Sequence, residues 1–379
     1  MTDNTIVVST PPHVKSKRTT RSIMLDVLIA LAPCAIAGIV FFGWQALVVE
    51  LVAVAACVAT EFVYFFILNK GFSKKCKDAG TVCRRFIKQF DFTSVITGLI
   101  LALILPSTVK WYEVLIGSIF AIAVVKMLFG GTGKNLVNPA AAARVFMFIS
   151  FAITTYTAAN IPALKFESGV FTDATNLSWL FPAEGNPSSK ISVLDLFLGT
   201  GVAGCIGETC KVAILLGYIY LSVRKVIKWW QPLAFIALFG FTAVLTSGFA
   251  FIATGGYIFD IELFLPHIFS GGVLFGAVFM FTDYTTSPKG IYGQILYYLL
   301  AAVLVAVLRY LTKLEVTSFV ILIMNIIVPL IDKYLIRKPF GYKRVKKIKQ
   351  NDTAPANAAA NLIEPVDANG AAYVEKEGE

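Results

Sequence analysis

Two consecutive apolar stretches decide the fold of this chain: residues 23–42 (IMLDVLIALAPCAIAGIVFF) and residues 44–68 (WQALVVELVAVAACVATEFVYFFIL). A helix crosses the hydrocarbon core of a bilayer when it has about 17–25 mostly apolar residues, and both stretches reach that length. Neither contains a lysine or arginine, and a single residue, Gly43, separates them. They predict a hairpin of two membrane-spanning helices.

The composition of the whole chain extends this prediction. Of the 379 residues, 57% are hydrophobic and 15% are charged, whereas soluble domains have about 25% charged residues. The chain has two histidines, and its six cysteines form no C-x-x-C pair, which argues against the common zinc, cluster and haem-attachment motifs. We therefore expect an integral membrane protein and no binding to nucleic acid.

Eight further apolar stretches follow the first two: 92–109, 112–128, 140–156, 210–223, 232–254, 265–281, 291–307 and 319–335. The sequence thus predicts an all-α integral membrane protein with about ten transmembrane helices. Five spans in each half would give the halves opposite orientations, as in inverted-repeat transporters. The glycine-rich stretch 194–209 interrupts the pattern and predicts a broken or re-entrant segment.

The basic residues predict the orientation. With the N-terminus inside, the cytoplasmic segments carry 27 of the 33 lysines and arginines, which agrees with the positive-inside rule. Both termini are then cytoplasmic in a multi-pass protein. The predicted division is a basic N-terminus (1–22), a membrane domain (23–342) with an outer loop (157–192), and a C-terminal tail (343–379) that is first basic and then disordered.

A glycine-rich motif, Phe129-Gly130-Gly131-Thr132-Gly133-Lys134-Asn135, precedes the fifth apolar stretch. It differs from a phosphate-binding P-loop, because Leu128 stands where that motif has its first glycine and Asn135 replaces the magnesium-binding hydroxyl. Two interpretations stay open for it. The glycines bring backbone amides close to a phosphate or a flavin ring, or they form a tight cytoplasmic turn.

Three acidic side chains stand in or next to segments that interrupt or end the apolar pattern. They are Glu208 in Gly204-Cys205-Ile206-Gly207-Glu208-Thr209-Cys210, Asp283 in Thr282-Asp283-Tyr284-Thr285-Thr286-Ser287-Pro288, and Asp332 in the last span. A carboxylate at membrane depth costs about 2.5–3.5 kcal/mol on insertion scales, so Glu208 is expected to face a cavity or a partner. Asp283, surrounded by hydroxyls, suits a small cation or a proton relay. The alternative for Asp283 is a helix end capped by its own side chain.

Several motifs together resemble the D subunits of Rnf electron-transport complexes and, less closely, the B subunits of sodium-translocating NADH:quinone reductases. The motifs are Val8-Ser9-Thr10-Pro11-Pro12-His13-Val14, residues 19–27 (TTRSIMLDV), residues 130–135 with Asn138-Pro139-Ala140, residues 204–209, Gly271-Gly272 with residues 282–288, and Val328-Pro329-Leu330-Ile331-Asp332. They occur in the order and at the spacing of the family, over about residues 7–345.

The resemblance implies a covalently bound FMN, joined through its phosphate to a threonine by a flavin transferase. The matching stretch is Thr172-Asp173-Ala174-Thr175, with Thr175 at the attachment position and Asp173 where the family usually has glycine. The orientation predicted above places Thr175 on the outer side, where that transferase acts. The residues expected around the flavin are Thr172, Asp173, Gly207, Glu208 and Thr209.

The resemblance also implies the wider function: electron transfer in a ferredoxin:NAD⁺ oxidoreductase complex that translocates Na⁺ or H⁺ across the bacterial inner membrane. The expected partners are the A, B, C, E and G subunits of Rnf, and a second, non-covalent flavin is an open possibility. Asp283 and Asp332 match acids of the family and are the candidates for a cation path. The alternative function is a stand-alone inverted-repeat transporter or channel without a cofactor, and a third is a membrane scaffold.

Overall fold

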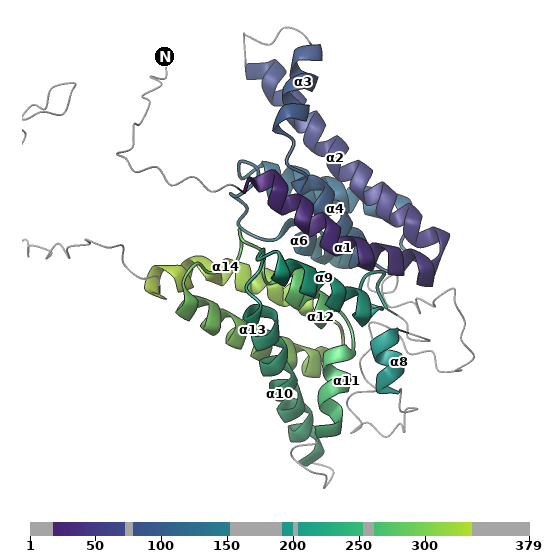
Figure 1. Ribbon diagram of the computed structural model, residues 1–379, viewed down its shortest axis with the longest axis vertical. Helices are drawn as coiled ribbons and strands as arrows, with labels where there is room; N and C mark the ends of the chain where they lie inside the picture. The colour runs from purple at the N-terminus through teal and green to yellow at the C-terminus, as the bar shows by residue number, and fades with distance from the viewer. Residues whose placement is uncertain (1–17, 73–78, 152–191, 200–203, 253–260, 336–379) are drawn as a thin grey trace, which may run out of the picture. The chain divides into compact units, whose positions relative to one another are not determined.

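The computed structural model describes residues 18–72, 79–151, 192–199, 204–252 and 261–335 (Figure 1). The regular structure of these ranges is helical. The first half contains α1 (Thr20–Phe42), α2 (Trp44–Phe72), α3 (Ala79–Gln89), α4 (Thr93–Leu103), α5 (Trp111–Ile119) with its π-helical continuation η1 (Phe120–Met127), and α6 (Pro139–Ser150).

The second half begins with α8 (Val193–Leu198). It continues with α9 (Lys211–Val223), α10 (Trp230–Ile252), the short 3₁₀ turn η4 (Ile261–Leu263), α11 (Phe264–Phe269), α12 (Val273–Phe275) with its π-helical continuation η5 (Gly276–Met280), α13 (Ile291–Thr312) and α14 (Thr317–Leu335). The predicted all-α class is confirmed.

Among the described residues, fewer than ten helices are long enough to span a membrane by themselves. In the described ranges, the five that qualify by length and hydropathy are α1, α2, α10, α13 and α14, and the number rises to seven if each of two bent pairs is one span. The apolar helices α6 and α9 are shorter. The difference from the expected number arises because several spans are interrupted.

Two of these interruptions are sharp bends. The helix axis turns by 67° between α3 and α4, and by 70° between α11 and α12. Residues 204–210 form a non-helical turn just before α9, as the glycine-rich sequence predicts. At the α11–α12 break Gly271 has a φ of 65°, a conformation that glycine adopts at little cost.

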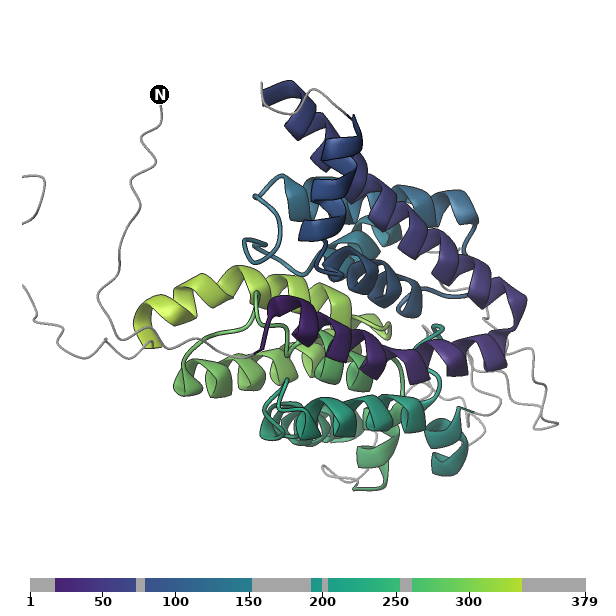
Figure 2. The same ribbon diagram turned by 45° about the horizontal axis from the view of Figure 1, so that its top comes forward.

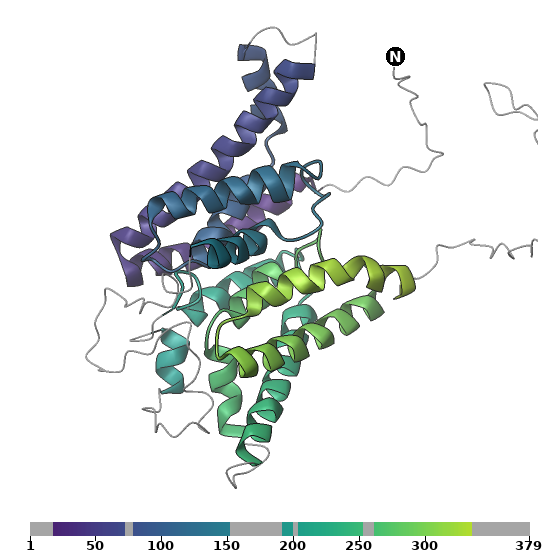
Figure 3. The ribbon, with the colours of Figure 1, turned by 180° about the vertical axis from the view of Figure 1, so that it is seen from behind.

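The helix packing repeats between the two halves. In the first half α2 packs on α4 and α5, and in the second α10 packs on α11 and α13. Between the halves α1 lies against α9, as Figures 1 and 2 show, and α6 lies against α14. Figure 3 shows α13 and α14 side by side in the second half. The two halves therefore use a similar set of helix contacts.

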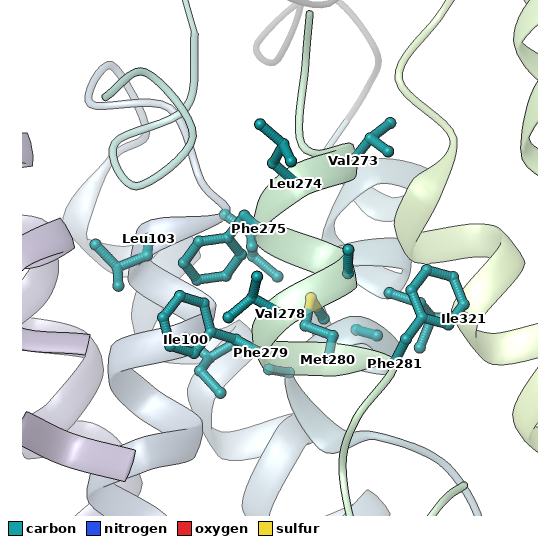
Figure 4. Close-up of a cluster of buried hydrophobic side chains, with 14 of the residues drawn as sticks. Ile100, Leu103, Val273, Leu274, Phe275, Val278, Phe279, Met280, Phe281 and Ile321 are labelled. Carbon is teal, nitrogen blue, oxygen red and sulfur yellow. The ribbon is translucent and has the colours of Figure 1, made fainter. Parts of the chain in front are cut away.

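The core between the halves is built around the broken helix α12–η5. Phe275, Phe279 and Phe281 lie between Leu103 of α4 and Ile321 of α14 (Figure 4). All five side chains are buried. The short helix is therefore enclosed by protein, which is the condition under which irregular backbone is tolerated at membrane depth.

Candidate functional site

The break between α11 and α12 is surrounded by buried charged side chains. Arg309 of α13 forms an ion pair with Glu315, and both side chains are 1% exposed. The Arg309 guanidinium also donates hydrogen bonds to the carbonyl oxygens of His267 (3.0 Å) and Ser270 (3.2 Å). These two carbonyls belong to the end of α11, so Arg309 satisfies backbone acceptors that the broken helix leaves free.

A second ion pair lies on the other side of the break. Arg144 Nη1 of α6 lies 3.2 Å from Glu208 Oε1 and 3.2 Å from Ser318 Oγ. Lys211 Nζ donates to the carbonyl oxygens of Glu208 (2.5 Å) and Thr209 (3.3 Å). The partner that the sequence required for Glu208 is therefore Arg144. We call Arg144, Glu208, Lys211, Arg309 and Glu315 the charge network.

Two adjacent glycines give the charge network its close contact with the break. A Cβ atom on Gly271 would overlap the Glu315 carboxylate, and one on Gly272 would overlap the Glu208 carboxylate. The pair Gly271-Gly272 thus lets an acid from each side reach the backbone between the two half-helices. Both glycines are needed for this geometry, since either overlap would displace a carboxylate from its arginine.

Of the residues expected around the covalent flavin, three are described, and each is engaged within the protein. Gly207 N donates to Leu103 O at 2.7 Å, and Thr209 Oγ1 donates to Cys205 O at 2.9 Å. Glu208 is the partner of Arg144. Thr172, Asp173 and Thr175 lie outside the described residues.

A pocket lies on the side that the charge count predicts to be cytoplasmic, and we call it the inner pocket. Its walls come from α1, α4, η1, residues 132–140, α9, η5 and residues 282–285. It encloses about 850 Å³ of atom-free space, including its open mouth. Both π-helical stretches line it, and such distortions of helices are frequent at functional sites.

Polar groups converge on the inner pocket. Lys126 Nζ, from η1, lies 2.8 Å from Glu61 Oε1 and 2.6 Å from Thr93 Oγ1. Asn138 Oδ1 caps α6 by accepting from the backbone N–H of Ala140 at 3.1 Å. Asn135 Oδ1 is buried and has no hydrogen-bond partner, so the pocket holds an acceptor that a ligand donor can satisfy.

Asp283 lines the inner pocket, whereas Asp332 does not. The Asp283 carboxylate accepts hydrogen bonds from Thr285 Oγ1 (2.8 Å) and Thr286 Oγ1 (3.2 Å), and Asp332 Oδ1 accepts from Lys289 N (3.2 Å). Burial raises the pKa of Asp283 above its ordinary value, although the hydrogen bonds oppose the shift. The connecting segment 284–289 therefore donates hydrogen bonds to both acids, from Thr285 and Thr286 to Asp283 and from the Lys289 N–H to Asp332.

The sequence did not reveal the basic members of these sites. The loop count assigned Lys126 and Arg144 to cytoplasmic segments and Lys211 and Arg309 to outer ones. In the structure Arg144 is half-buried and the other three are buried, and all four form ion pairs or hydrogen bonds. The available signal was the apolar sequence on both sides of Arg144, because a charge in such a stretch requires a partner.

Comparison with known proteins agrees with the motifs. A sequence profile of the NQR2, RnfD, RnfE family matches residues 7–341. The chain is 36% identical over 350 residues to the D subunit of the Na(+)-translocating ferredoxin:NAD(+) oxidoreductase complex of Acetobacterium woodii, covering 92% of this chain and 99% of that protein. It is 34% identical over 352 residues to the D subunit of the proton-translocating ferredoxin:NAD(+) oxidoreductase complex of Clostridium ljungdahlii, covering 90% and 98%. This chain therefore belongs to the NQR2, RnfD, RnfE family.

Proposed function

We propose that this chain is the D subunit of an ion-translocating ferredoxin:NAD⁺ oxidoreductase complex and transfers electrons within the membrane. The observation that carries the proposal is the similarity along almost the full length of two relatives whose names state this complex. The helical, apolar architecture agrees with such a role. Its partners are then the other subunits of the complex, A, B, C, E and G, in the bacterial inner membrane.

Purification of the tagged chain from its native host tests the function. A D subunit is expected to co-purify with other subunits, and the preparation should reduce NAD⁺ with reduced ferredoxin. If the chain is instead isolated without other subunits, contains no flavin and transports a solute, it is a stand-alone transporter. Deletion of the chain provides the control, because the ferredoxin-dependent activity of the membranes should disappear with it.

The covalent flavin is the second part of the proposal. The sequence at residues 172–175 and the predicted outer position of Thr175 support FMN attached to that hydroxyl. FMN supplies one-electron transfer, and the protein contributes its position and electrostatic surroundings. A phosphoester to Thr175 would keep the cofactor beside its redox partners on the outer side, and attachment would need a dedicated flavin transferase.

The inner pocket is the place we propose for a second, non-covalent flavin. The unpartnered Asn135 Oδ1 suits the ring N–H of an isoalloxazine, and Phe279 offers an aromatic wall. Lys126 would place a positive charge at the same pocket. These features fit a flat, partly apolar ligand with hydrogen-bonding edges.

We expect Asn135→Ala to increase the loss of the non-covalent flavin during purification and to leave the covalent flavin in place. Loss of one hydrogen bond of about 1 kcal/mol would weaken binding roughly fivefold. The measurement is the flavin content of the supernatant and of the denatured chain after purification. Lys134→Ala is the matched control, since Lys134 is exposed in the same loop and does not line the pocket. Equal flavin release from both variants would contradict the assignment.

Asp283 and Asp332 are the residues we propose for the cation path. Asp283→Asn removes a negative charge at the inner pocket, and a hydrogen bond or ligand bond to a charged group contributes about 1.5–3 kcal/mol. We therefore expect the Na⁺ concentration for half-maximal turnover to rise roughly tenfold or more, with the covalent flavin retained. Lys333→Gln, at the exposed end of α14, should leave the Na⁺ dependence unchanged. Wild-type Na⁺ dependence in Asp283→Asn would exclude Asp283 from the path.

A further inference from the structure

One buried acid lacks the compensation that the others have. Six acidic side chains are buried in the part of the chain that the structure describes: Asp26, Glu50, Glu61, Glu113, Glu208 and Glu315. Four of them form ion pairs, with Arg224, Lys126, Arg144 and Arg309. Glu113 stands in the first turn of α5, where the helix dipole stabilises a negative charge. Glu50, in the second turn of α2, has neither kind of support.

The surroundings of Glu50 favour its neutral form. The residue is 7% exposed, and Oε1 is buried without a hydrogen-bond partner. A Cβ atom on Gly38 of α1 would lie 3.5 Å from Glu50 Oε1 and 3.0 Å from Ile206 O, so the carboxyl and this carbonyl flank the same glycine. A carboxylate has only acceptors and would stay charged in this buried place, whereas a carboxylic acid is uncharged and has an O–H to donate.

Ile206 O belongs to the non-helical turn before α9. The Ile206 N–H donates to Leu105 O at 3.1 Å and the Gly207 N–H to Leu103 O at 2.7 Å, which fixes this turn against the end of α4. Carbonyls of interrupted helices coordinate the coupling ions of membrane transporters. The unpartnered acid thus lies next to the type of backbone group that such sites use.

No charged neighbour substitutes for the missing partner. The elements packed on α2, together with residues 204–210, carry the titratable groups Arg21, Asp26 and Cys34 (α1), Cys83, Arg84, Arg85 and Lys88 (α3), Tyr112 and Glu113 (α5), Lys126 (η1), and Cys205, Glu208 and Cys210. Helix α4 carries none. Among the described residues, none of these groups forms a hydrogen bond or ion pair with Glu50.

A surface groove reaches the same turn of α2. It is lined by the start of α2, from Trp44 to Val49, and by the 107–111 connection, and it encloses about 680 Å³ including its open mouth. Val48 and Val49, which directly precede Glu50, belong to its wall. Because the charge count predicts the α1–α2 turn to be outside, the groove opens on the predicted outer side, and its wall reaches the residue before Glu50 in α2.

We propose that Glu50 is a proton-binding site in the outer half of the membrane domain. Its carboxyl is neutral in the resting protein and exchanges its proton with water of the outer groove. The site is separate from Asp283 and Asp332, and it does not depend on a flavin. It gives the chain a protonatable group on the side opposite the inner pocket.

Modification by a lipid-soluble carbodiimide tests the proposal. A carboxylic acid adds across one C=N bond: its proton goes to nitrogen and its oxygen to carbon, and acyl transfer to nitrogen then gives a stable N-acylurea with no leaving group. We expect peptide mass spectrometry of the treated membranes to find this adduct on Glu50, with a yield that falls along a one-proton curve as the pH rises. Glu61, which is paired with Lys126, should stay unmodified.

Three results would overturn the proposal. The first is the absence of an adduct on Glu50 at every pH, and the second is equal modification of Glu61. The third is suppression of the Glu50 adduct by Na⁺ but not by K⁺ at constant pH, because this result would assign a Na⁺ site to Glu50. Because the labelling uses the wild-type chain in its membrane, it gives an answer even if the proposed electron-transfer function fails.

A pair of variants supplies a second readout. Glu50→Gln should remove the adduct and leave the amount of chain in the membrane unchanged, and Glu50→Asp should restore modification at position 50. Persistence of the adduct on that peptide in Glu50→Gln would contradict the assignment. If Glu50→Gln lowers the amount of chain in the membrane, the proposal is judged by the pH dependence of the Glu50 adduct in the wild-type chain.

Discussion

Thr175→Ala is expected to remove the covalent flavin from the chain completely. The phosphoester needs a hydroxyl oxygen, and alanine has none, so the effect is all-or-none. The measurement is flavin fluorescence of the chain after denaturing electrophoresis, on protein produced in the native host with its own flavin transferase. The variant chain should be present in normal amount and lack fluorescence.

The matched control for this prediction is Thr172→Ala. It removes a hydroxyl from the same short stretch but not from the attachment position, and its band should stay fluorescent. A fluorescent Thr175→Ala band would exclude Thr175, and a dark wild-type band would exclude covalent attachment to this chain. Loss of fluorescence in Thr172→Ala alone would place the attachment at Thr172.

The second large effect is expected from Arg309→Met. This change leaves the Glu315 carboxylate buried without its ionic partner, and it frees the carbonyls of His267 and Ser270 at the α11–α12 break. Breaking a buried ion pair by removing one partner costs about 3–5 kcal/mol. We expect a clearly lower thermal unfolding midpoint of the purified protein in detergent, or loss of the chain from the membrane.

The double variant Arg309→Met with Glu315→Gln distinguishes charge from packing. Glutamine removes the unpaired charge and keeps the size of the side chain, so part of the lost stability should return. Lys333→Met, at the exposed end of α14, should change stability by less than about 0.5 kcal/mol. If Arg309→Met were as stable as Lys333→Met, the ion pair would not support the broken helix.

The helical class and the positions of the apolar segments could be predicted because they depend on local composition. Residues 23–42 and 44–68 became α1 and most of α2, since a long apolar stretch has few alternatives to a membrane helix. The glycine-rich stretch 194–209 predicted an interruption, and residues 204–210 do form a non-helical turn. The 70° bend at Gly271-Gly272 was not predictable in angle, because it depends on Arg309 and Glu315 contacting the break from another part of the chain.

The candidate sites were predicted only in part, for the same reason. Glu208 could be recognised as an acid that needs a partner, but Arg144 lies 64 residues away in sequence, and hydropathy carries no information about such a pair. The loop count also assumes that basic residues lie in loops, and Arg144 and Arg309 do not. Glu50 stands in an apolar stretch, as Glu208 does, and what distinguishes it in the part of the chain that the structure describes is that it has no ion-pair partner.

Cation uptake by inverted membrane vesicles tests the central proposal most directly. The vesicles come from a native host that carries the wild-type chain, the Thr175→Ala variant or a deletion, and they receive reduced ferredoxin and NAD⁺. We expect NAD⁺ reduction with accumulation of Na⁺ or H⁺ in wild-type vesicles, and neither in the other two. Undiminished NAD⁺ reduction and ion uptake in the deletion vesicles would contradict a role of this chain in electron-driven ion transport.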